Sequence, residues 1–132
     1  MTANTVPIFT LTPVIGYAEI SVANTARDGT GSLGTVLTGA IAGTRVSRIR
    51  VISAGSQVSN GMVRLFIDTA GSAILYDECP ITATTVSASS VGFDYSFEYL
   101  GERALIIPYQ TSIKASTSIA EPFKVWAEGG NY

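Results

Sequence analysis

The chain has 132 residues and a formal net charge of −2, with one cysteine, Cys79, and no histidine. This length suffices for one domain with a buried core, and a single cysteine leaves no disulfide within the chain to support it. Because histidine is the commonest general base and metal ligand, and because the charge balance is acidic, we expect no catalytic residue, metal, cofactor, nucleic-acid partner or membrane partner.

Short apolar or alternating segments recur about every ten residues along the chain, separated by Gly, Asn, Ser and Pro. This spacing predicts an all-β protein: a single antiparallel β-sandwich over residues 1–132, with about eight to ten strands in jelly-roll or another Greek-key order. Residues 1–12 are expected to form an extended N-terminal arm. The expected strands are residues 6–11, 15–23, 33–40, 44–53, 61–69, 72–77, 91–100, 103–108, 111–117 and 121–128.

The segments 44–53 and 61–69 are joined by a linker that contains Gly55 and the Asn60-Gly61 step. Both features supply the positive φ values that tight turns need, so the two segments are expected to pair as a hairpin.

Four arginines lie in this predicted hairpin: Arg45, Arg48, Arg50 and Arg64. Symmetric pairing would place Arg50 opposite Arg64, with Phe66 on the same face. As a group they are candidates for contact with an acidic partner or a phosphate. The alternative is neutralisation within the sheet by carboxylates of adjacent strands, for which the candidates are Asp68, Asp94 and Glu98.

Residues 91–100 alternate aromatic with polar or acidic side chains, the period of a half-buried strand. Four aromatic side chains share one face: Phe93, Tyr95, Phe97 and Tyr99. An exposed stripe of this size exceeds what a soluble monomer usually carries, so we expect a second sheet or a partner chain to cover it.

Alternation in residues 121–128 places Phe123 and Val125 on one face and Trp126 on the other. Trp126 and the nearby Tyr109 are candidate partner contacts. The simpler alternative is that both side chains pack in the core or in an interface. Together with three further tyrosines they could instead form the base of a sugar-binding site, because aromatic rings stack on pyranose faces. Those tyrosines are Tyr17, Tyr95 and Tyr99.

The Thr-rich start, the segment 44–51 and the closing segments 107–109, 113–117 and 123–130 follow one another in a recognisable order. This layout resembles the small jelly-roll structural proteins of tailed bacteriophages, and head decoration (cement) proteins are the nearest group. The resemblance implies a non-enzymatic virion protein, made in the host cytoplasm. It would form a homo-oligomer, expected to be a trimer, bind the major capsid protein on the capsid surface and stabilise the head, with the arm as a tether.

The alternative is a glycan-binding or structural module of a phage tail or fibre, in which tyrosine and tryptophan rings contact sugars. Only 14% of the residues are charged, and such a neutral surface suits packing against neighbours in either setting.

Overall fold

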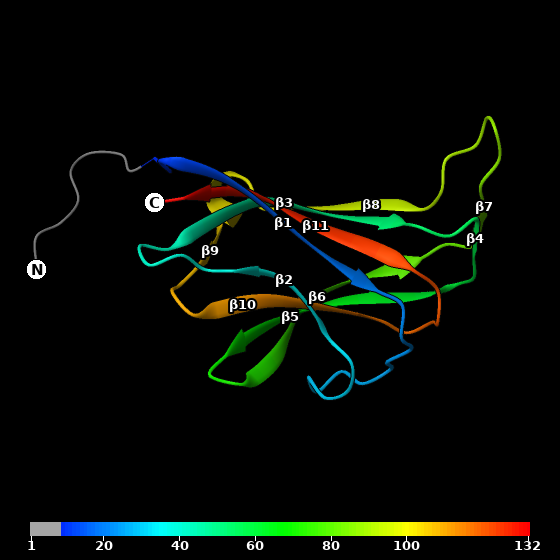
Figure 1. Cartoon of the computed structure of the whole chain (residues 1–132), viewed down its shortest axis with the longest axis horizontal. Helices are drawn as coiled ribbons and strands as arrows, with labels where there is room; N and C mark the ends of the chain where they lie inside the picture. Colours follow the sequence, from blue (N-terminus) through cyan, green and yellow to red (C-terminus); the bar gives the residue numbers. More distant parts are fainter. Residues whose placement is uncertain (1–8) are drawn as a thin grey trace, which may run out of the picture.

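The computed structural model describes residues 9–132, which form two facing antiparallel sheets and a short ribbon (Figure 1). The first sheet contains, in spatial order, β1 (Thr12–Ile20), β11 (Phe123–Asn131), β3 (Thr44–Ser53) and β8 (Asp94–Glu98), with β9 (Leu105–Ile107) also paired to β3. The second contains β2 (Gly34–Thr38), β10 (Thr111–Thr117), β5 (Gly61–Thr69) and β6 (Ser72–Ile81). The ribbon pairs β4 (Gln57–Val58) with β7 (Thr84–Thr85).

The strand order is that of a jelly roll. β8 and β9 act as one edge strand that the 3₁₀ turn η1 (Gly101–Arg103) interrupts, since both pair with β3. Along the chain the eight main strands then change sheet at each connection except the hairpin of β5 with β6, which gives two interlocked Greek keys. The predicted all-β sandwich is therefore confirmed. Of the expected first strand, residues 6–8 lie outside the described residues, as does most of the arm, and residues 9–11 form no strand.

The predicted hairpin of residues 44–53 and 61–69 is wrong. Both segments are strands with the expected bounds, but β3 belongs to the first sheet and β5 to the second. Residues 54–60 therefore carry the chain from one sheet to the other, and Arg50 does not face Arg64. Each strand has one apolar face, and packing face to face across the core satisfies that pattern as well as pairing side by side would.

The core lies between the sheets, where inward-facing side chains of both layers meet. The largest of them include Ile49, Leu65, Ile107, Ile113 and Phe123, all essentially inaccessible. The aromatic face of residues 91–100 is covered as expected, because Phe93, Phe97 and Tyr99 are buried; Tyr95 remains 40% exposed at the sheet edge. Cys79 is also fully buried, and burial raises the pKa of its thiol to about 12.

The loop of residues 21–33 folds over the outer face of the second sheet. The backbone amide of Asn24 attaches it to β10 by donating to the carbonyl of Thr117 at 2.8 Å. The ion pair of Arg27 with Glu78, at 2.7 Å, attaches it to β6. Phe66 lies on this face and is fully buried, outside the main core cluster. The sequence-based proposal that Phe66 contacts a partner is therefore corrected, because this face is not bare.

Candidate interaction site at the open edge

Among the described residues, both sheets end without a hydrogen-bonded neighbour on each side of the sandwich. On one side the edge strands β1 and β2 lie close together, so that a Cβ atom at Gly16 would collide with the carbonyl oxygen of Val36. On the other side β6 pairs with β5, and β8 and β9 pair with β3. Two adjacent hollows open between these strands, an apolar groove of about 420 Å³ and a polar hollow of about 470 Å³, and Tyr76 lines both. We call this region the open edge.

A β-bulge at Tyr76 shapes the open edge. The pairing of β5 with β6 passes from Leu65 opposite Asp77 to Phe66 opposite Leu75, so Tyr76 is the extra residue on β6. A bulge bends its strand and redirects the side chains beyond it. Ile74 therefore stands opposite Ile67 at the mouth of the groove.

The apolar groove is an uncovered end of the core. Leu105 and Ile107 on β9 are buried at its base, and Ile67 on β5 packs partly against the core. At its mouth, however, Ile74 is 67% exposed; Ile106, 53% exposed, also lines the groove, but it pairs with Arg45 and its side chain lies on the outer side of the first sheet. Water contacts apolar side chains here at a position where a second layer would normally cover them.

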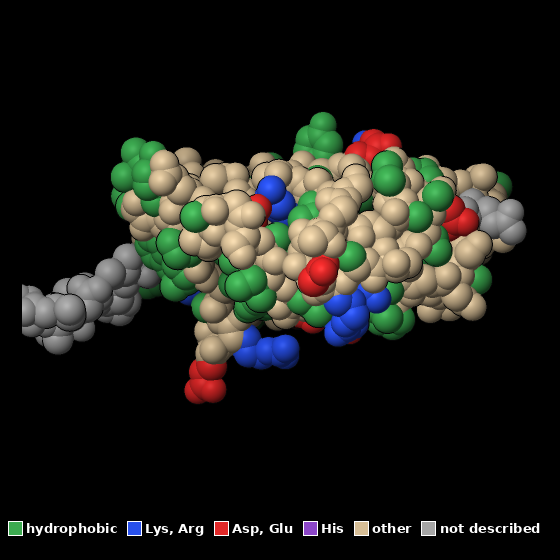
Figure 2. All heavy atoms as spheres, turned by 90° about the horizontal axis from the view of Figure 1, so that it is seen from below, with side chains coloured by type: hydrophobic (Ala, Val, Ile, Leu, Met, Phe, Trp, Pro, Cys, Tyr) green, Lys and Arg blue, Asp and Glu red, His purple; other side chains and the backbone are tan. Residues whose placement is uncertain are grey.

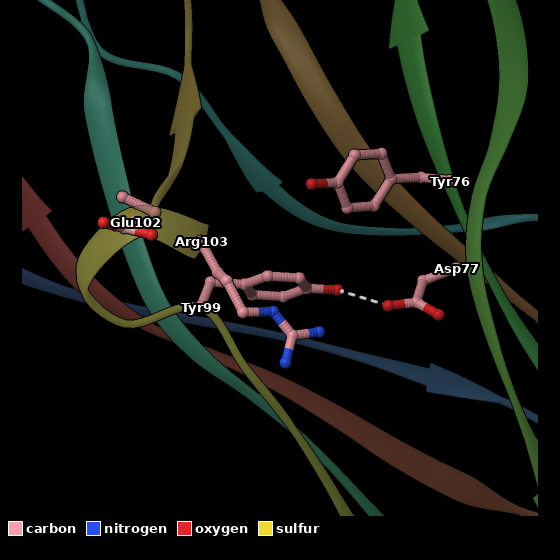
Figure 3. Close-up of a pocket in the computed structure, with 6 residues that line it drawn as sticks. Tyr76, Asp77, Tyr99, Glu102 and Arg103 are labelled. Carbon is pink, nitrogen blue, oxygen red and sulfur yellow. Dashed lines mark hydrogen bonds between the residues drawn. The ribbon is translucent and has the colours of Figure 1, made fainter.

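The polar hollow lies between β6 and η1 (Figure 3). The phenol of Tyr99 donates a hydrogen bond to Asp77 at 3.1 Å, and the rings of Tyr76 and Tyr99 lie 5.9 Å apart. Burial and the neighbouring Asp77 charge raise the pKa of the Tyr99 phenol, so it remains a donor at ordinary pH. Glu102 and Arg103, from η1, complete the lining, and within residues 9–132 neither forms an ion pair.

Asp77 is held in place by hydrogen bonds within the chain. It accepts the Tyr99 hydroxyl through one oxygen and the backbone amide of Glu78, at 2.9 Å, through the other. What the hollow offers is an exposed aromatic ring, carboxylates and a guanidinium.

The predicted arginine group does not assemble. Arg45, Arg48 and Arg50 lie on the outer face of the first sheet, whereas Arg64 lies on the outer face of the second, on the opposite side of the molecule. The arginines are separated because β3 and β5 belong to different sheets, which face each other across the core. In the described part of the chain, Arg45 forms no ion pair.

The other three arginines form ion pairs with carboxylates, but of the expected partners Asp68, Asp94 and Glu98 only Asp94 pairs with an arginine among the described residues. Arg50 pairs with Asp94 at 3.2 Å. Arg48 pairs with Glu128 through two nitrogens, and Arg64 shares Glu78 with Arg27. Asp68, expected as an arginine partner, pairs with Lys114 instead.

The outer face of the first sheet, which we call the outer face from here on, carries Trp126 as predicted. Its ring stacks on that of Tyr17 at 4.8 Å between centroids, and the ammonium of Lys124 lies 5.7 Å from the centre of the Tyr17 ring. Tyr109 is exposed in the turn after β9, beside the apolar groove. The five aromatic residues considered for a sugar site are thus divided between the outer face and the open edge.

Sequence reasoning missed Ile74, Tyr76, Ile106, Glu102 and Arg103. Their local patterns are ordinary, and their importance comes from lying on the last strands of two sheets. Within residues 9–132, no group of three or more Cys, Asp or Glu side chains is arranged to hold a metal ion, and no helix is long and apolar enough to cross a membrane. No protein-family model matches the chain, and a search of curated proteins returned no match.

Proposed function

We propose that this protein is a non-enzymatic structural component of a bacteriophage virion, a decoration protein that binds the major capsid protein and stabilises the head as a homotrimer. The observation that carries the proposal is the open edge, where core side chains reach the surface along two unpaired strands. A protein whose function is contact area benefits from such an edge, whereas a free monomer is exposed to aggregation there.

The low charge of the surface also supports an assembly role. In the view from below, uncharged groups cover most of the molecule, and the charged side chains are few and scattered (Figure 2). Charged side chains on the outer face pair with each other within the chain, as Arg48 does with Glu128 and Lys124 with Glu19. Apart from Arg45, the basic side chains of this face can therefore be covered by a neighbour without burying unpaired positive charge.

In this proposal the open edge joins copies of the protein, and the outer face binds the capsid lattice. In the proposed trimer each copy presents a different surface to each of its two neighbours, so the contacts are heterologous, and a rotation of 120° between copies closes them into a ring. Three copies match the threefold junctions of a capsid lattice. The stacked Tyr17 and Trp126 rings give the outer face a central aromatic anchor of the kind that dominates interface energies.

Binding to phage heads tests this proposal. Purified protein is mixed with heads assembled without it and sedimented over a range of salt concentrations, with Trp126→Ala and Tyr109→Ala as matched variants. We expect saturable binding that Trp126→Ala weakens by at least about tenfold, whereas Tyr109→Ala leaves head binding unchanged, since an interface anchor contributes about 2 kcal/mol or more. Protein that stays in the supernatant at every salt concentration would refute the proposal.

A second candidate function, glycan binding within a tail or fibre, is favoured by the polar hollow. Tyr76 offers a ring for stacking, and the unpaired Glu102 and Arg103 can bond sugar hydroxyls. A glycan array separates the two functions: binding lost in both Tyr76→Ala and Arg103→Ala, and retained in Trp126→Ala, would favour the glycan site. An array without signal would remove this candidate.

A further inference from the structure

We propose that the apolar groove of the open edge binds the N-terminal segment, residues 5–11, of a second copy of this chain. This inference rests on the proposed self-association and names the part of the second copy that fills the groove. It depends on three observations: the character of the groove, the character of the segment, and their positions in the fold.

The groove is built to accept an extended apolar segment. Its mouth presents Ile74, and its walls are β6 and β9, which have no strand on their outer sides among the described residues. Unpaired main-chain groups on such strands can bond an added strand, while the groove takes up alternate side chains. The required occupant is therefore a β-forming segment with apolar side chains.

The start of the chain provides such a segment. Phe9 is 77% exposed and Leu11 is 83% exposed, so residues 9–132 of the same chain leave both side chains uncovered. Val6, Pro7 and Ile8 precede them in the sequence, and the segment contains no charged side chain. Its chemistry complements the groove.

The segment and the groove lie at the same end of the sandwich. Thr12 is opposite Asn131, Asn131 is opposite Thr44, and Thr44 is opposite Ile107 at the groove. Three steps between strands, of about 4.8 Å each, thus separate the base of the segment from the groove. Figure 1 shows the start of β1, the end of β11 and β9 together at this end.

A second copy is a better source of the occupant than the same chain. The backbone amide of Leu11 donates to the carbonyl of Asn131, which holds Leu11 beside β11. To enter the groove of its own chain, the segment would have to cross the ends of β11 and β3. Tyr132 stands there, its amide bonded to the carbonyl of Gly43. At about 3.3 Å per residue, an extended segment of residues 5–8 would span about 13 Å from Phe9, far enough to enter the groove of an adjacent copy.

Engineered cysteines test the exchange. The variant Ile8→Cys/Ile74→Cys is oxidised mildly and analysed on a non-reducing gel. A second variant, Ile8→Cys/Ile106→Cys, detects the same exchange if the segment binds at a shifted position along the groove. The native Cys79 is fully buried and does not compete. The matched control is Ile8→Cys/Val22→Cys, because Val22 is similarly exposed but lies on the loop of residues 21–33.

We expect covalent dimers and trimers, lost on reduction, to form at least about tenfold faster than in the control, since docking raises the effective concentration of the two thiols. Equal rates, or a product linked within one chain, would overturn the exchange. Light scattering on the reduced protein separates the two proposals: a trimer without specific cross-links refutes only the exchange, whereas a monomer at every concentration also refutes self-association.

Discussion

Replacing Ile74 by serine should weaken assembly while leaving the fold intact. Ile74 is 67% exposed in the single chain, so its loss should change the free energy of unfolding by no more than about 0.5 kcal/mol. Full burial of an isoleucine side chain is worth about 1.5–3 kcal/mol, and covering the exposed two-thirds therefore contributes about 1–2 kcal/mol per contact. Three equivalent contacts in a trimer sum to about 3–6 kcal/mol, which raises the overall dissociation constant about a hundredfold to ten-thousandfold.

The assay is light scattering over a dilution series, with Val22→Ser as the matched control, since Val22 is also exposed but lies away from the open edge. The wild-type chain and the control should keep a mass of about three times 13.8 kDa down to concentrations at which Ile74→Ser has dissociated. Urea titration of each variant verifies that the fold is unchanged. If Ile74→Ser dissociates along the same curve as the control, the reasoning about the open edge is refuted.

Three further predictions concern the fold. Phe66→Ala should lower the free energy of unfolding by about 3–5 kcal/mol in urea titration, because Phe66 is fully buried; a loss below about 1 kcal/mol would mean that the loop above it does not cover it. Cys79, whose pKa is raised to about 12, should resist thiol reagents at pH 8 until the chain unfolds, and rapid labelling of native protein would contradict its burial. Arg27 and then Arg64 lower the pKa of Glu78, so the stability from this carboxylate is present above its unfolded pKa of about 4.5 and is lost as pH falls through the lower folded value. Acid titration of Glu78→Gln should therefore show less dependence on pH in that window, and an unchanged acid profile would exclude this role.

Much of the strand content could be predicted because alternation is a local property. The bounds of β3, β5 and β10 agree with the segments 44–53, 61–69 and 111–117, where apolar residues recur mainly at alternate positions. Their partners could not be predicted in the same way. The linker 54–60 has the glycine and asparagine of a tight turn, yet it spans the two sheets, and only contacts distant in sequence decide between these outcomes.

The end of the chain shows the limit of composition as a guide. Gly129 and Gly130 suggest a flexible tail, but they belong to β11. A Cβ atom at Gly129 would collide with the carbonyl of Arg45, and one at Gly130 would collide with the side chain of Thr10. These glycines permit close approach of neighbouring strands, which the sequence does not distinguish from flexibility.

The candidate site depended even more on long-range structure. Trp126 was correctly placed outward from alternation alone, and the pairing of Arg50 with Asp94 was among the expected alternatives. The open edge could not be recognised, because β6 and β9 become edges only through the jelly-roll order. The bulge at Tyr76 adds one unpaired residue that period-2 reasoning cannot detect.

Reconstruction by cryo-electron microscopy of phage heads incubated with the purified protein tests the central proposal most directly. The proposal predicts density in groups of three at the threefold junctions of the lattice, with neighbouring copies joined along β6 and β9 and the Tyr17 and Trp126 face against the shell. Bare heads at saturating protein concentration, or single copies bound without contact to one another, would contradict it.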